Sequence, residues 1–409
     1  MTSKNSTLFV RLREISRELW VRVTAFSVAA VLLAALASWV GPYLPDGFGF
    51  ELASGAVDDI LNILAASMLT VTTFSVSIMV TAYGSATSNA TPRATRLLAE
   101  DNAAQTAVGV FIGSFLFSIV GIVGLAMGLY QGNSRVLLFL ATLGDIALIT
   151  WALLRWVDHL NSFGRMHDIV SRIERVATTA AERYRDRPAL GAIPGTSPLS
   201  TDAATVASRQ HGYVRAVDMM ALQGVAADQN LIVEMLRMPG KYVHEGEPLL
   251  RLSREVEDDV AETLRDAVLI GNQRSFDEDV GYGLIVLSEV ASRALSPAVN
   301  DPGSAIDALR AGTRVLMALH GTPSDDAAQS CDRVYAPEPD LGAIYASFFS
   351  SIARDGAGLI EVQETLLDCL AALSQVTDRP YPQIEAERAK TRALAALDQA
   401  WERDRLNAA

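Results

Sequence analysis

The sequence predicts an α-helical membrane bundle of four transmembrane helices, followed by a cytoplasmic α+β domain that consists of a small β module and a helical bundle. Hydrophobic residues make up 50% of the chain, and the mean hydropathy is +0.23. The first 160 residues carry nine Lys/Arg and ten Asp/Glu, so nearly all of the net charge of −13 lies in residues 161–409. A sparsely charged front half and an acidic back half predict a membrane part and a water-exposed part.

Four stretches are long and apolar enough to span a bilayer, which needs about 20 residues. They comprise residues 23–40, 60–83, 103–130 and 136–154, and only the last contains a charged residue, Asp145. The first stretch has an alternative interpretation, because Ala35-Leu36-Ala37 resembles a signal-peptidase site. About twenty residues that include Glu14 and Glu18 precede this stretch, which favours an uncleaved anchor.

Basic residues in the flanking segments predict the orientation. They gather before the first span, between the second and third, and after the fourth, whereas Arg135 alone lies on the other side. We therefore expect a multi-pass protein of the bacterial inner membrane with both termini in the cytoplasm. The two isolated cysteines, Cys331 and Cys369, are typical of a reducing compartment.

Small polar residues follow one face of the second span. At 100° per residue they share an arc of about 140°, which Ile63 and Phe74 interrupt. These residues are Asp59, Asn62, Ser67, Thr70, Thr73, Ser77 and Thr81. Polar groups in hydrocarbon turn toward protein or water, so we expect the face to point inward. It either packs closely against a neighbouring helix or lines a hydrated path.

The third and fourth spans each add one feature. Glycines on one face of the third span predict a helix-packing surface, because residues without a side chain let backbones approach. They are Gly109, Gly113, Gly121, Gly124 and Gly128. Asp145, near the middle of the fourth span, is costly at that depth and is either a functional or a structural acid.

The chain divides into five predicted parts: a transmembrane domain (1–158), a helical extension of the last span (159–187), a linker (188–204), a small β module (205–254) and a cytoplasmic helical domain (255–409). Strand-like segments cover residues 212–217, 231–236 and 248–252, with a short helix between the first two. Helices are expected near residues 256–270, 277–295, 302–320, 341–354, 359–374 and 382–406.

The back half contains no recognisable catalytic motif. It has no phosphate-binding glycine loop, paired-cysteine zinc pattern or Gly-x-Ser-x-Gly, so we expect no cofactor and favour a non-enzyme.

His159 and His167 are more than two helical turns apart, which argues against a metal site. Asn300 and Asp301 precede Pro302, where Asp301 caps a helix or, alternatively, the pair binds a small ligand. The acidic charge argues against nucleic-acid binding.

Four segments are similar to a known family. SMLTVTTFSVSIMV (67–80), SNATPRATRLL (88–98), RSFDEDV (274–280) and RALSPAVNDP (293–302) resemble the bacterial membrane family called domain of unknown function 2254. The resemblance covers nearly the whole chain and implies a four-helix inner-membrane protein with a cytoplasmic domain. Members tend to have a His-His pair after the last span, where this chain has Asp158-His159. The resemblance implies no activity.

Two hypotheses of function follow. In the first, the chain is a homo-oligomeric channel- or transporter-like protein for small ions or solutes, with a regulatory cytoplasmic domain. In the alternative, the bundle only anchors an interaction or ligand-sensing module that transports nothing. The partners we expect are membrane lipid and further copies of the chain, whereas the sequence identifies no cytoplasmic partner.

Overall fold

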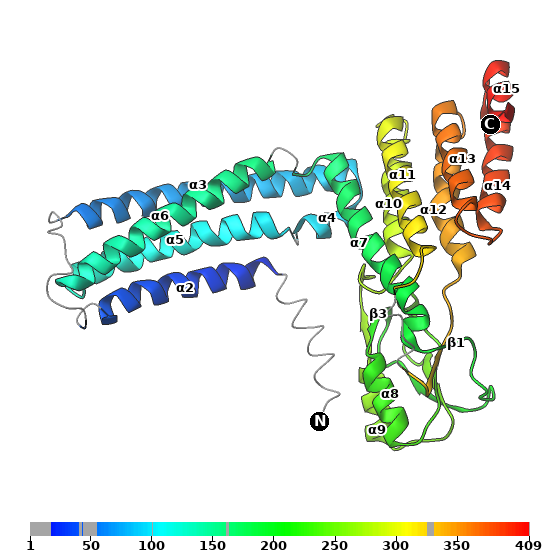
Figure 1. Ribbon diagram of the computed structural model, residues 1–409, viewed down its shortest axis with the longest axis horizontal. Coiled ribbons are helices and arrows are strands. Elements are labelled where there is room, and N and C mark those ends of the chain that lie inside the picture. Colours follow the sequence, from blue (N-terminus) through cyan, green and yellow to red (C-terminus); the bar gives the residue numbers. More distant parts are fainter. Residues whose placement is uncertain are drawn as a thin grey trace. The chain divides into compact units, whose positions relative to one another are not determined.

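The structure, a computed structural model, describes residues 18–40, 43, 55–99, 101–160, 163–324 and 331–408. The chain divides into two compact units (Figure 1). The four-helix unit holds the described residues within Leu12–Thr87 and Thr95–Arg165. The mixed unit holds Ser88–Ala94 and the residues described from Met166 onward.

Four helices in the described residues are long and apolar enough to cross a membrane, which confirms the four predicted spans in length and composition. They are α2 (Leu19–Val40), α3 (Ala56–Asn89), α5 (Asn102–Ala126) and α6 (Asn133–Leu160). The short α4 (Pro92–Ala99) connects α3 to α5. Helix α2 packs against α5 and α6, and α5 packs against α6.

The last span does not continue as one helix. We expected residues 159–187 to extend it, but α6 ends at Leu160 and α7 runs over Met166–Asp186. Between them Gly164 has a φ of +76°, in the left-handed region that favours glycine. A Cβ at Gly164 would lie 3.0 Å from the Cβ of Ala82, so the turn also needs a residue without a side chain.

The β module contains two small sheets. Strands β1 (Ile193–Pro194), β8 (Val334–Ala336), β4 (Val233–Met235), β6 (Pro248–Leu252) and β2 (Ala204–Ala207) form one sheet in that order. In it β8 pairs in parallel with β1 and β4, and the other pairs are antiparallel. Strands β5 (Tyr242–Val243), β3 (Gly212–Val217) and β7 (Val268–Gly271) form the second, antiparallel sheet. One core contains Val214 and Val217 of β3, Val233 of β4 and Leu222 of α8 (Met219–Asp228).

Three strands of the β module, β1, β7 and β8, lie outside the predicted range of residues 205–254. Strand β1 follows a single 3₁₀ turn, η2 (Pro188–Gly191), inside the expected linker, and β8 comes from the expected loop before residue 341. Helix α9 (Asp258–Asp266) stops before β7, whose residues had been expected to continue it. Val268, Leu269 and Ile270 favour a strand when a neighbour is available, and β3 supplies that neighbour.

The helices of the mixed unit pack in successive pairs (Figure 1). Helices α10 (Tyr282–Ala294) and α11 (Pro302–Leu319) lie against α7 and against each other. Helix α12 (Leu341–Asp355) packs on α10, and α13 (Ile360–Ser374) packs on α11. Helix α14 (Tyr381–Ala396) covers α12 and α13, and α15 (Ala400–Ala408) follows it. Helix α10 therefore touches three other helices of this unit.

Candidate functional site

The polar residues of α3 lie on one exposed face of the four-helix unit. We call Asp59, Asn62, Ser67, Thr70, Thr73, Ser77 and Thr81 the α3 stripe; all are exposed except Ser67, which is partly buried. The buried residues of α3 lie on the opposite side of the helix and include Leu61, Met68, Ser75, Met79 and Ala86. Within a single chain, the side that turns inward is therefore the side opposite the stripe.

This placement limits the two interpretations of the stripe. A polar path bounded by this chain's own helices would require the stripe to face α2, α5 or α6, and in the described residues it does not. Both a path and a polar packing surface remain compatible with a second copy that faces the stripe. The expectation of an inward face thus does not hold within one chain and becomes a question about the assembly.

The hydroxyl groups of the stripe bond to their own helix. Thr70 Oγ1 donates to the carbonyl of Ala66 at 3.1 Å, and Thr73 Oγ1 donates to the carbonyl of Leu69 at 2.9 Å. Thr81 Oγ1 makes the same bond to Ser77, also at 2.9 Å. Such bonds satisfy the hydroxyl proton in hydrocarbon, while the hydroxyl oxygens keep lone pairs that can accept further bonds.

The predicted glycine face is a close contact between helices. A Cβ at Gly109 would lie 2.7 Å from the Phe26 ring of α2, and one at Gly121 would lie 2.9 Å from Leu61 of α3. At Gly124 it would overlap the ring of Tyr130, whose hydroxyl donates to the Ala34 carbonyl at 2.8 Å. Gly113 faces the Phe26 backbone, whereas Gly128 lies after the end of α5 with a φ of +69°.

Asp145 of α6 faces α5, not α3. Its Oδ1 accepts a hydrogen bond of 2.7 Å from Ser114 Oγ, and Ser114 is buried. The other carboxyl oxygen, Oδ2, is buried and has no hydrogen-bond partner among the described residues. Asp145 therefore does not bond to the hydroxyls of the α3 stripe.

The end of α6 holds a buried acid–histidine pair that the sequence did not predict. His159 Nε2 lies 3.0 Å from Asp101 Oδ1, and the same oxygen accepts from the backbone N–H of Ala104 at the start of α5. The rings of Trp156 and Phe163 pack near the imidazole. Because Asp101 is far from His159 in sequence, no spacing rule could have joined them.

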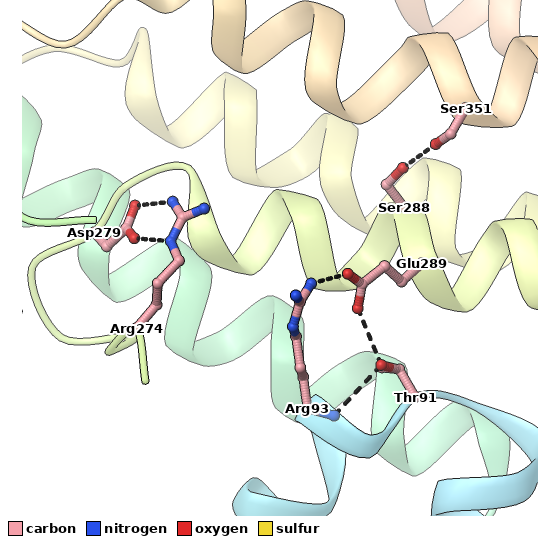
Figure 2. A network of polar contacts seen from close by, with 7 residues as sticks. All are labelled: Thr91, Arg93, Arg274, Asp279, Ser288, Glu289 and Ser351. Atoms are coloured by element: carbon pink, nitrogen blue, oxygen red, sulfur yellow. Dashed lines mark hydrogen bonds and ion pairs between the residues drawn. The ribbon is translucent and has the colours of Figure 1, made fainter. Parts of the chain in front are cut away.

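In the mixed unit, the residues that follow α3 bond to α10 (Figure 2). Thr91 Oγ1 donates to Glu289 Oε2 at 3.0 Å, and the Arg93 guanidinium forms an ion pair with the other oxygen of that carboxylate. Thr91 is only 5% exposed, whereas the Arg93 side chain is 49% exposed. We call these three residues the Glu289 cluster.

Two further polar contacts hold α10 in place (Figure 2). Before its first turn, Arg274 donates two hydrogen bonds to Asp279, at 2.6 and 2.8 Å. Along the helix, the hydroxyl of Ser288 is hydrogen-bonded to that of Ser351 on α12. Helix α10 is thus bonded at its start, on its α12 side and on the side that meets the segment after α3.

Glu278 lies next to the Arg274–Asp279 pair and contacts the β module. Its Oε2 accepts from the backbone N–H of Val217 at 3.0 Å. Burial raises the pKa of Glu278 from its ordinary 4.5 to about 7; the bond from Val217 and the charge of Arg183 act against this, whereas Asp277 and Asp218 add to it. Glu278 therefore changes charge near neutral pH at a point where strand β3 meets the segment before α10.

Comparison with known proteins supplies the family. The family described as predicted membrane protein (DUF2254) matches residues 16–372. The chain belongs to this family. Membership identifies a predicted membrane protein of uncharacterised function.

The curated relatives of this DUF2254 chain are mycobacterial proteins. Uncharacterized protein Mb1321c of Mycobacterium bovis and uncharacterized protein Rv1290c of Mycobacterium tuberculosis are each 24% identical to it over 347 residues. The match covers 81% of this chain and 66% of each relative, so the chain spans slightly less than two thirds of their length. No solved structure matches the chain.

Three of the segments that carry the DUF2254 resemblance meet at α10. Residues 88–98 contain Thr91 and Arg93, residues 274–280 precede the helix, and residues 293–302 start in its last turn. Glu289 belongs to none of these segments, so no motif in the sequence distinguished it from other surface acids.

The exposed loop after α10 contains the two candidate ligand residues. Asn300 is in the left-handed region, with a φ of +50°. Asp301 caps α11 by accepting from the backbone N–H of Ser304 at 3.1 Å and from its hydroxyl at 2.6 Å. These bonds lower the pKa of Asp301. The cap accounts for Asp301, and no described contact assigns a ligand to Asn300.

Proposed function

We propose that this DUF2254 protein forms a homo-oligomer in the bacterial inner membrane, and that the α3 stripes of several copies line a polar path for small ions or solutes. The observation that carries the proposal is the position of the stripe, which is exposed on one chain and lies opposite the buried side of α3.

The cost of polar groups in hydrocarbon supports this assembly. The back-bonded hydroxyls of Thr70, Thr73 and Thr81 are tolerable in lipid one at a time. A continuous row that also contains Asp59 and Asn62 gains more by facing water or polar protein than by facing acyl chains. Identical copies related by rotational symmetry present the same stripe to a common axis.

The Glu289 cluster supports a regulatory role for the mixed unit, which we expect in the cytoplasm because of the basic residues that flank the spans. Thr91 and Arg93 are two and four residues beyond the end of α3, and both bond to Glu289. A movement of α10 would therefore act directly on the end of the helix that lines the path. Coupling of this kind needs two arrangements of α10 with different free energies.

Flux measurements in liposomes test the path. Thr73→Leu and Ser77→Leu replace a small polar side chain of the stripe with a bulky apolar one, and we expect either to change ion flux at least several-fold. Val76→Leu, an exposed α3 position beside the stripe, is the matched control and should leave flux unchanged. No flux by the wild-type protein under ion gradients or membrane tension would overturn the proposal.

A second function is favoured by one observation: the β module has a hydrophobic core composed entirely of its own unit. A unit that folds around its own core suits a membrane-anchored module that binds a partner or ligand without transport. Replacing the four-helix unit with an unrelated anchor distinguishes the two functions, because a sensing module keeps the cellular phenotype and a path-forming protein loses it.

A further inference from the structure

Asp145 is the one ionisable side chain in the middle of the four spans. Helix α5 contains no charged residue, α2 has Arg22 near its start, and α3 has only Asp58 and Asp59 in its first turn. On α6 itself, Arg135 and Arg155 are each ten residues from Asp145, about 15 Å along the helix axis at the usual rise per residue. No span of this chain therefore offers a basic partner at that depth, and neither does any span of an identical copy.

The contacts of Asp145 do not suit a buried negative charge. Ser114 gives the carboxyl one hydrogen bond, at 2.7 Å, while Oδ2 is buried without a partner among the described residues. Other buried hydroxyls of α5 and α6 already donate to backbone carbonyls: Ser118 to Ser114 at 2.9 Å and Thr142 to Leu138 at 2.8 Å. An ionised carboxylate that accepts from a single donor in an apolar interior is strongly disfavoured relative to its protonated form.

A metal ion does not fit the site either. Hard cations such as Mg²⁺ and Ca²⁺ take six or more oxygen ligands, of which carboxylates form a large part. Among the described residues, no group of three or more His, Cys, Asp or Glu side chains is placed to hold a metal ion. A carboxyl group that faces one serine hydroxyl can still bind a proton, which needs no further ligand.

We propose that Asp145 is a proton-binding site of the four-helix unit, with Ser114 as the residue that positions it. At neutral pH the carboxyl is protonated: Oδ2 carries the proton, and Oδ1 accepts from Ser114. Loss of the proton leaves a buried charge on the surface where α5 packs against α6, so these helices separate or admit water. The site lies away from the α3 stripe and does not depend on the proposed path.

Infrared spectroscopy of the full chain in lipid nanodiscs tests the proposal. Wild-type protein should show a protonated-carboxyl C=O band at pH 7 that Asp145→Asn removes. In Ser114→Ala the band should remain but move, because the bond from the hydroxyl is lost; a purely structural serine would leave its frequency unchanged. Spectra are compared in the Glu278→Gln background, because Glu278 also carries a proton near neutral pH. Asp59→Asn, an exposed acid of α3, is the matched control and should leave the band unchanged.

Two results would overturn the assignment. One is a spectrum at pH 7 in which Asp145→Asn removes no protonated-carboxyl band. The other, which remains decisive if Asp145→Asn does not fold, is an unmoved band in Ser114→Ala. Neither readout requires ion flux, so a failure here is separate from a failure of the proposed path.

Discussion

Thr91 donates a hydrogen bond of 3.0 Å to Glu289, and the two residues are 198 positions apart in the sequence. Thr91 lies two residues after the end of α3, and Glu289 lies on α10, the helix where three DUF2254 segments meet. Because Thr91 is buried and Arg93 is half exposed, the two contacts of Glu289 should differ in strength. A hydrogen bond shielded from water is worth more than an ion pair screened by it.

Removing these contacts one at a time tests that difference. Thr91→Val deletes the buried hydroxyl at nearly constant volume and should cost about 1 kcal/mol or more in free energy of unfolding. Arg93→Met deletes the exposed ion pair and should cost less than about 1 kcal/mol. Thermal unfolding of the detergent-solubilised chain would rank the two variants. A larger loss in Arg93→Met would contradict the assignment of Thr91 as the stronger contact.

The glycine face offers a second matched comparison. Gly124→Ala places a methyl group on the ring of Tyr130 and should destabilise the four-helix unit by about 1–3 kcal/mol. Gly144→Ala, on α6, meets nothing within 4 Å and should be neutral or slightly stabilising, since alanine is the better helix former. Equal unfolding midpoints for the two variants would show that α5 does not need glycine at position 124.

Sequence periodicity predicted which residues share a face, but not what that face meets. The spans followed from length and composition, because a bilayer demands about 20 apolar residues. Periodicity grouped the residues of the α3 stripe, yet the side that they take relative to the other helices depends on packing that periodicity does not contain. Asp145 illustrates the same limit, since its partner Ser114 lies on a helix whose contact with α6 is a tertiary property.

Short strands were the other difficulty. The segments that contain β3, β4 and β6 were predicted: the first two contain valine or isoleucine, and the third is an apolar run that follows turn residues. Strand β8 has three residues and pairs with β4, whose sequence lies about a hundred residues earlier. A strand of that length has no recognisable pattern and forms only because a partner edge is available.

The raised pKa of Glu278 predicts a stability that depends on pH. The unfolded chain has a pKa near 4.5 at this residue and the folded chain about 7, so between these values the folded state binds more protons. Stability contributed by the protonated group is therefore lost as pH rises from about 4.5 to 7 and stays lost above it. Glu278→Gln should stabilise the protein by up to about 3 kcal/mol at pH 8 and hardly at all at pH 4. Unfolding midpoints of both forms across this range check the sign, and an equal difference at pH 4 and 8 would contradict it.

The cap of α11 has the opposite dependence on pH. Hydrogen bonds from Ser304 lower the pKa of Asp301 in the folded chain. The stability that the ionised cap contributes is therefore present above the pKa of the unfolded chain and disappears as pH falls through the pKa of the folded chain. Asp301→Ala should cost about 1 kcal/mol at pH 7. Asp301→Asn keeps a capping side chain. Its free energy of unfolding should therefore fall by less, and its cap should not weaken as the pH is lowered. If Asp301→Asn destabilises the protein as much as Asp301→Ala does at pH 7, the charge of Asp301 has a role other than capping.

Cross-linking between copies separates a packing surface from an open path at the α3 stripe. Cys331 and Cys369 are buried and are first replaced by alanine, so that an introduced cysteine is the reactive thiol. Ser77→Cys lies on the exposed stripe, whereas the control Met79→Cys lies on the buried side of the same helix. A disulfide requires Cα atoms within about 7 Å. If two stripes pack directly, Ser77→Cys forms disulfide-linked dimers under mild oxidation; if they surround a path, it links only through a longer thiol-reactive spacer. Met79→Cys should link under neither condition. Ser77→Cys that stays monomeric with every spacer would place the stripe in lipid, and the homo-oligomer built on α3 would then be wrong.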